Sequence, residues 1–241
     1  MNKQNHFYCP ALIDAWSDYF YKGILDDGTI EHRYAFVRNI GYSLQYLEYL
    51  DNLILTSNLH ETVLVQSFKS FIVIGMGIIE ALLYYILKKN NLNKQYHWEM
   101  ITEQQSGSYS EGQVKYRIIN KVEKELIDPV DIEMKLVWMI RKVESKKLLG
   151  IKEQVYKDLN YLRKLRNRLH IHQFQNYTDT DFNAFRSNEV KLMKKVLHSV
   201  LSADPFTSNN QDIGLLKFLL IEERTDELIP DVLFDEDDIP F

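Results

Sequence analysis

One stretch limits what this chain can fold into: residues 71–87, F-I-V-I-G-M-G-I-I-E-A-L-L-Y-Y-I-L, are apolar on nearly all sides of a helix. Such a helix has to be buried, either in a protein core or in a membrane. The stretch is short for a membrane span, and Glu80 lies near its middle, where a carboxylate would cost about 3 kcal/mol in a bilayer. We therefore predict a helix over about residues 60–89 at the centre of a helical bundle, with no membrane contact.

The remaining composition also favours helices. The 241 residues include only nine glycines and five prolines, so the turns that a many-stranded sheet needs are scarce. Apolar side chains recur at three- and four-residue steps, which indicates amphipathic helices. These further helices are expected at about 10–23, 32–55, 113–126, 130–149 and 179–202, with an exposed polar loop at 102–112. Another helix is expected from about residue 152 into the motif at 162–172, and its end stays open. The predicted fold class is all-α.

The chain divides into three predicted parts. Residues 1–58 form an N-terminal helical extension, residues 59–222 form the bundle, and residues 223–241 form a flexible acidic C-terminal tail with too little apolar content to fold alone. The net charge of −5 argues against broad wrapping of nucleic acid. Because acidic residues gather in the tail, a local basic site on the body remains compatible with that charge.

Two features predict a cytoplasmic protein. The single cysteine, Cys9, cannot form an intrachain disulfide, and no zinc-ligand spacing occurs, which suits a reducing compartment. The N-terminus lacks the apolar run and small-residue cleavage site of a secretory signal. We expect neither a metal nor a cofactor.

The motif that carries chemistry is L-R-K-L-R-N-R-L-H-I-H at residues 162–172. Four of its polar side chains fall on one face of a helix at 100° per residue. They are Arg163, Arg166, Asn167 and His170. His172 would point to the opposite side of a continuing helix, so it joins this face only if the helix ends near residue 171.

A compact cluster of arginine, asparagine and histidine suits phosphodiester chemistry. Imidazole takes or gives a proton near neutral pH, and guanidinium can hold a phosphate through two hydrogen bonds. No acidic cluster for two-metal chemistry accompanies the motif. RNA cleavage would therefore use the 2′-hydroxyl as internal nucleophile and leave a 2′,3′-cyclic phosphate. On spacing alone, the alternative is a solvated basic helix face, which such residues more often form.

The motif resembles a family signature. Arg166-Asn167 followed by His172, or Arg163 followed by His170, resembles the R-x4-6-H signature of HEPN domains, in which a polar residue, often asparagine, commonly follows the arginine. Helical geometry favours His170 as the partner of the arginines, whereas the Arg-Asn pairing of the family favours His172. Both histidines remain candidates.

The setting of the motif also resembles that family. HEPN domains are helical bundles with the signature at the end of a late helix, and their earlier core helix often carries a glutamate in an apolar setting, similar to Glu80 in G-I-I-E-A-L-L. The resemblance covers about residues 60–202. Residues 59–222 are thus expected to form a HEPN-like bundle.

The resemblance implies a homodimeric endoribonuclease that needs no metal, similar to family members that act as toxins or in defence against phage. Its partners would be RNA and an antitoxin or defence-system protein. His170 or His172 would activate the 2′-hydroxyl or protonate the leaving oxygen. Arg166 and Arg163 would stabilise the charge of the phosphorane, and Asn167 would orient the arginine or the phosphate.

Two interpretations of Glu80 stay open. A carboxylate among apolar side chains needs a partner, so Glu80 either pairs with Arg166 or Arg163 or reaches the edge of the bundle.

The candidates for contacting RNA around the motif are Tyr161, Lys164, Arg168 and Tyr177. The alternative function is a non-catalytic module that uses the same helix for RNA binding, dimerisation or contact with a partner protein.

Overall fold

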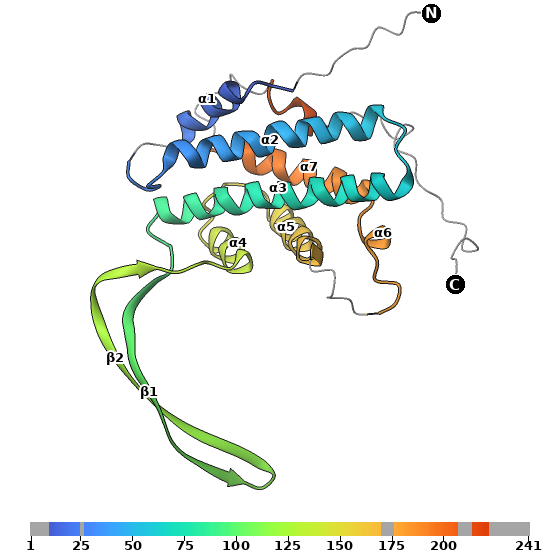
Figure 1. Ribbon diagram of the computed structural model, residues 1–241. Helices are drawn as coiled ribbons and strands as arrows, with labels where there is room; N and C mark the ends of the chain where they lie inside the picture. The colour runs from blue at the N-terminus through green and yellow to red at the C-terminus, as the bar shows by residue number, and fades with distance from the viewer. Residues whose placement is uncertain (1–9, 25–26, 170–175, 207–213, 222–241) are drawn as a thin grey trace, which may run out of the picture.

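The computed structural model describes residues 10–24, 27–169, 176–206 and 214–221. Its centre is the long helix α3 (Glu61–Lys89), which begins and ends within a residue of the predicted limits. Helix α2 (Arg33–Thr56) lies along α3, and α7 (Ser187–Leu201) lies behind it in Figure 1. Helices α4 (Leu136–Ser145) and α5 (Glu153–Arg166) pack below α3 in the same view. The predicted central helix is confirmed.

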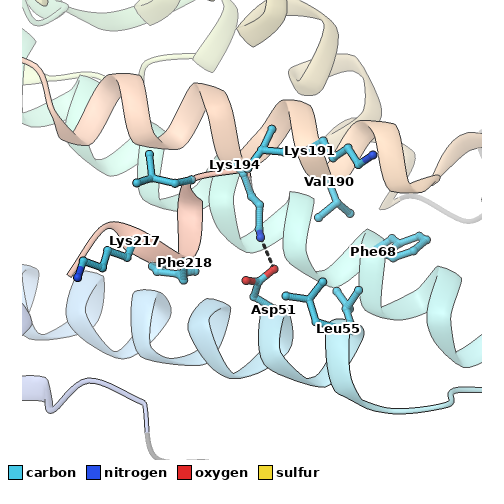
Figure 2. A pocket seen from close by; sticks show the side chains of 11 residues that line it. Asp51, Leu55, Phe68, Val190, Lys191, Lys194, Lys217 and Phe218 are labelled. Atoms are coloured by element: carbon cyan, nitrogen blue, oxygen red, sulfur yellow. Dashed lines mark ion pairs between the residues drawn. The ribbon is translucent and has the colours of Figure 1, made fainter. Parts of the chain in front are cut away.

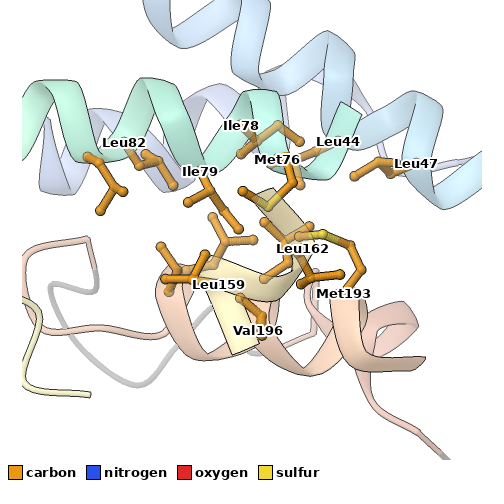
Figure 3. Close-up of a cluster of buried hydrophobic side chains, with 14 of the residues drawn as sticks. Leu44, Leu47, Met76, Ile78, Ile79, Leu82, Leu159, Leu162, Met193 and Val196 are labelled. Atoms are coloured by element: carbon orange, nitrogen blue, oxygen red, sulfur yellow. The ribbon is translucent and has the colours of Figure 1, made fainter. Parts of the chain in front are cut away.

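The apolar side chains of these helices form one core. Figure 3 shows Met76 and Ile79 of α3 against Leu159 and Leu162 of α5 and Met193 of α7, and all five are at most 2% exposed. Burial of each such side chain contributes about 1.5–3 kcal/mol through the hydrophobic effect. The core therefore fixes the position of α5, which carries the motif.

Helix α1 (Ile13–Gly23) packs on α2, and its largest apolar residues belong to the same core. Trp16 and Phe20 are fully buried. Tyr19 donates a hydrogen bond of 2.7 Å to the carbonyl oxygen of Leu201 in α7. Residues 10–24 and α2 are thus continuous with the bundle, while the acidic tail lies outside the described residues.

Helix α3 is long and apolar enough to cross a membrane. However, 61% of its most apolar window is buried inside the fold, as in the core helix of a soluble protein. Figure 1 shows why, because α2, α4, α5 and α7 surround it. Burial in the core therefore accounts for the apolar stretch at residues 71–87.

The all-α prediction is wrong, because the described residues include a long antiparallel β-hairpin. Strand β1 (Gln95–Glu111) pairs with β2 (Val114–Asp131) in place of the predicted loop and helix. Apolar side chains recur every four residues at Val114, Ile118 and Val122, and this spacing fits a strand of period two as well as a helix. Two features favour the hairpin. Strand β2 is rich in β-branched and aromatic residues, and Gly112 supplies the φ of +60° that the turn needs.

The hairpin shortens the helix predicted after it. Strand β2 continues to Asp131, so α4 begins only at Leu136 rather than near residue 130. The helix predicted from 179 to 202 is also divided, into the short α6 (Asp181–Ala184) and α7. The remaining predicted helices match α1, α2 and α3 within about three residues.

A close contact between α1 and the segment after α7 predicts a test of the packing. A Cβ on Gly23 would lie 2.8 Å from the backbone Cα and oxygen of Phe206, which no side-chain rotation can relieve. We expect Gly23→Ala to lower the free energy of unfolding by about 1–3 kcal/mol in urea titrations. Gly77→Ala is the matched control, because nothing lies within 4 Å of its Cβ position in α3. That control should stabilise the protein by about 0.5–1 kcal/mol, and equal effects of the two changes would contradict the contact.

Candidate functional site

The motif lies at the C-terminal end of α5. Apolar residues at three- and four-residue steps, from Val155 to Leu165, bury one side of this helix in the core. The α-helix ends at Arg166, and a single 3₁₀ turn follows over Asn167–Leu169. The end of this helix, which the sequence left open, is thus at Arg166 within the motif. Both motif histidines, His170 and His172, lie outside the described residues.

Arg166 pairs with Glu80 of the central helix. Its Nη2 donates a hydrogen bond of 2.9 Å to Glu80 Oε2, and the two side chains are 34% and 30% exposed. A charge-assisted hydrogen bond of this kind fixes the direction of the guanidinium. The pairing of Glu80 with a motif arginine is confirmed, and it holds Arg166 at the point where the chain leaves α5.

Further ion pairs hold the two sides of the histidine-bearing segment 170–175. Arg168, just before the segment, pairs with Asp179, just after it. Asp181, at the start of α6, accepts hydrogen bonds from Lys69 Nζ at 2.7 Å and from Gln66 at 3.2 Å, both on α3. Together with the Glu80 contact, these pairs attach both ends of the segment to α3.

Arg163 differs from Arg166. Its side chain is half-buried, and its Nε is buried without a hydrogen-bond partner among the described residues. A buried donor in this state costs about 1–3 kcal/mol until water or an anion satisfies it. The Nε–H group of Arg163 is thus enclosed in the fold, one helical turn before Arg166.

The other sequence-predicted residues are distributed around the end of α5. Lys164 and Asn167 are exposed, and Tyr177 is exposed across the segment that carries the histidines. Tyr161 is partly engaged, because its hydroxyl donates a hydrogen bond of 3.0 Å to Glu189 of α7. Partial burial and this contact raise the pKa of Tyr161. The predicted residues therefore gather at one end of α5, although Arg166, Arg168 and Tyr161 each already have an intrachain partner.

A second charged cluster, which the sequence did not single out, lies between α2 and α7. Asp51 Oδ1 is 2.5 Å from Lys194 Nζ, and the side chains are only 8% and 11% exposed. The pair borders a pocket of about 270 Å³, shown in Figure 2, whose wall includes Phe68, Val190 and Phe218. Burial raises the pKa of Asp51, and the adjacent Lys194 opposes this shift. The cluster joins two helices, and it takes no part in the motif.

Among the residues that the structure describes, no three histidine, cysteine, aspartate or glutamate side chains lie together as a metal site would require. The motif region offers guanidinium, amide and hydroxyl groups to a ligand, and these suit an anion such as a phosphate.

Comparisons with known proteins give no match: no family model fits the sequence, and no curated protein or solved structure is similar to the chain. The resemblance to HEPN domains therefore depends on the motif and its setting alone.

Proposed function

We propose that the protein is a metal-independent endoribonuclease of HEPN type that acts in the cytoplasm as a homodimer. The observation that carries the proposal is the pair between Arg166 and Glu80. Glu80 of α3 holds the guanidinium of Arg166 at the end of α5, directly before the segment that contains both motif histidines. A toxin or phage-defence effector, kept in check by an antitoxin or a defence-system partner, is the role that the resemblance suggests.

The proposed reaction uses the RNA itself as nucleophile. His170 or His172 takes the proton of the 2′-hydroxyl, and the 2′-oxygen attacks the adjacent phosphorus. The bond from phosphorus to the 5′-oxygen breaks, and that oxygen takes a proton from the other histidine or from water. Arg166 stabilises the added negative charge on the phosphorane, and Arg163 adds to this stabilisation through its positive charge. The products are a 2′,3′-cyclic phosphate and a 5′-hydroxyl.

The test is cleavage of end-labelled RNA by the purified full-length chain in excess EDTA. We expect cleavage to persist without divalent metal and the new 3′ ends to carry cyclic phosphate, which product analysis can identify. The double variant His170→Ala/His172→Ala should cleave at least about 100-fold more slowly, because no imidazole remains to move the proton. Absence of cleavage, or equal cleavage by this variant, would refute the proposal.

A specific observation favours a second candidate, a non-catalytic module that binds RNA or a partner protein. Arg166 and Arg168 already pair with carboxylates of the same chain, with Glu80 and Asp179 respectively. Such pairs also hold helix ends in place without any chemistry. RNA binding or dimerisation by a chain that leaves RNA intact under all conditions would support this candidate.

A further inference from the structure

The hairpin β1–β2 is an arm that leaves the bundle beside α3 and α4 (Figure 1). Seventeen residues of β1 extend over about 55 Å at about 3.3 Å per residue. Three register shifts, the last between Gln105 and Gly107, bend the ribbon along its length. A two-stranded ribbon has two exposed faces and little stability of its own, so most side chains of the arm are open to contact with a ligand.

The tip of the arm carries an exposed aromatic platform. Tyr109 and Tyr116 are cross-strand partners, and their rings stack with centroids 5.1 Å apart and an angle of 19° between the planes. They are 54% and 40% exposed. Gly107 lies two residues before Tyr109 on the same face of β1, and nothing lies within 4 Å of the place where its Cβ would be. A flat group can therefore stack on the rings and extend over the glycine.

Cations accompany this platform on β2. Lys115 and Arg117 flank Tyr116 in sequence and are exposed, and strand alternation directs them to the opposite face of the ribbon from the rings. In the part of the chain that the structure describes, neither forms an ion pair, whereas Lys121 pairs with Glu103 at 3.4 Å. Residues 103–121, whose two strands pair with each other, contain three cations and two carboxylates, a net charge of +1 in a chain of net charge −5. The positive charge of the arm is thus located at its tip.

We propose that the tip of the arm binds single-stranded RNA. Unpaired bases stack on Tyr109 and Tyr116, and Lys115 and Arg117 attract the phosphates from the other face of the narrow ribbon. Stacking and positive charge are the combination by which proteins hold single strands. The choice of RNA over DNA rests on the proposed ribonuclease function.

The first test measures binding of a short fluorescent 2′-O-methyl RNA to the full-length chain by anisotropy. This probe cannot be cleaved, because its 2′-oxygen is blocked. We expect Tyr109→Ala to weaken binding about tenfold or more, as the loss of one stacked base does, while Tyr109→Phe binds like the wild type. Tyr96→Ala is the matched control, since Tyr96 is 59% exposed at the base of the arm. It should leave the affinity unchanged.

The second test varies the salt concentration. Each lost phosphate contact lowers the slope of log K against log salt by about 0.7 for a single strand, so Lys115→Ala/Arg117→Ala should lower it by about 1.4. Lys124→Ala removes an exposed cation near the base of the same strand and should change the slope by less than half of that amount. A DNA strand of the same sequence, bound as tightly as the RNA, would show a site for single strands of either kind and overturn the restriction to RNA.

The outcomes separate this proposal from the ribonuclease. Binding that depends on Tyr109 in a chain that never cleaves RNA would sustain the arm site and refute the cleavage. If the wild type cleaves RNA, and Tyr109→Ala and Lys115→Ala/Arg117→Ala bind RNA as tightly as the wild type, the arm site is refuted and the ribonuclease is sustained. If the tip variants instead turn a dimer into monomers while RNA affinity stays constant, the arm is a protein interface and the RNA proposal is wrong.

Discussion

Replacement of Arg166 by alanine is expected to slow RNA cleavage by about 100- to 1000-fold, the usual effect of losing one donor that stabilises transition-state charge. The structure gives the reason, because Glu80 holds the guanidinium with a hydrogen bond of 2.9 Å at the end of α5. The phosphorane carries more negative charge than the bound RNA, so the loss should appear in kcat more than in KM. Single-turnover cleavage at several RNA concentrations separates these two quantities.

The matched control is Lys164→Ala, which removes an exposed cation two residues before Arg166. It should change kcat by less than about threefold, because Lys164 has no carboxylate of α3 to direct it. A cycle with Glu80→Gln isolates the ion pair: if Glu80 acts through Arg166, the double variant should be no slower than Arg166→Ala alone. Additive losses would show that Glu80 acts separately from the arginine.

Replacement of Asp51 by alanine is expected to lower the free energy of unfolding by about 3–5 kcal/mol. The change leaves Lys194 without its partner, and that side chain is only 11% exposed between α2 and α7. Urea unfolding at neutral pH, followed by circular dichroism, measures the effect. Glu153→Ala is the control on an exposed pair with Lys157, where little or no change in stability is expected.

The pair of Asp51 and Lys194 should contribute much less to the free energy of unfolding than the loss caused by removing one partner alone. Burial raises the pKa of Asp51 even though Lys194 lies beside it, so the ionised carboxylate is in an unfavourable environment. Asp51→Ala combined with Lys194→Met removes both charges and should regain most of the stability lost in the single variant. Equal destabilisation by the single and double variants would mean that lost packing, rather than an uncompensated charge, is the cause.

The sequence predicted correctly those helices whose apolar spacing fits a helix and not a strand. The stretch at 71–87 has no polar face, and it forms the middle of α3. The partner of Glu80 was also foreseeable, because a lone carboxylate among apolar residues needs a cation and the motif supplied arginines. The arm was not foreseen, since Val114, Ile118 and Val122 satisfy the helical and the strand period alike.

Other parts of the site depend on tertiary contacts that a single sequence does not display. Asp51 and Lys194 are 143 positions apart on two amphipathic helices rich in other charges, so nothing local marks them as partners. In retrospect, each falls on the apolar side of its helix, Asp51 between Leu47 and Ile54 and Lys194 between Val190 and Leu197. That position was the available signal. No glycine or proline near Arg166 marks the end of α5 in the sequence.

The base of the arm has an evolutionary consequence. The backbone N–H of Ile132 donates a hydrogen bond of 2.9 Å to the carbonyl oxygen of Lys94, so the chain leaves the bundle and returns to it at the same place. Lys88 of α3 secures that junction through Asp131 at 2.9 Å. A whole ribbon could thus have been gained, lengthened or exchanged between related chains without altering the order or packing of the helices. Recognition and core architecture can diversify independently in such a protein.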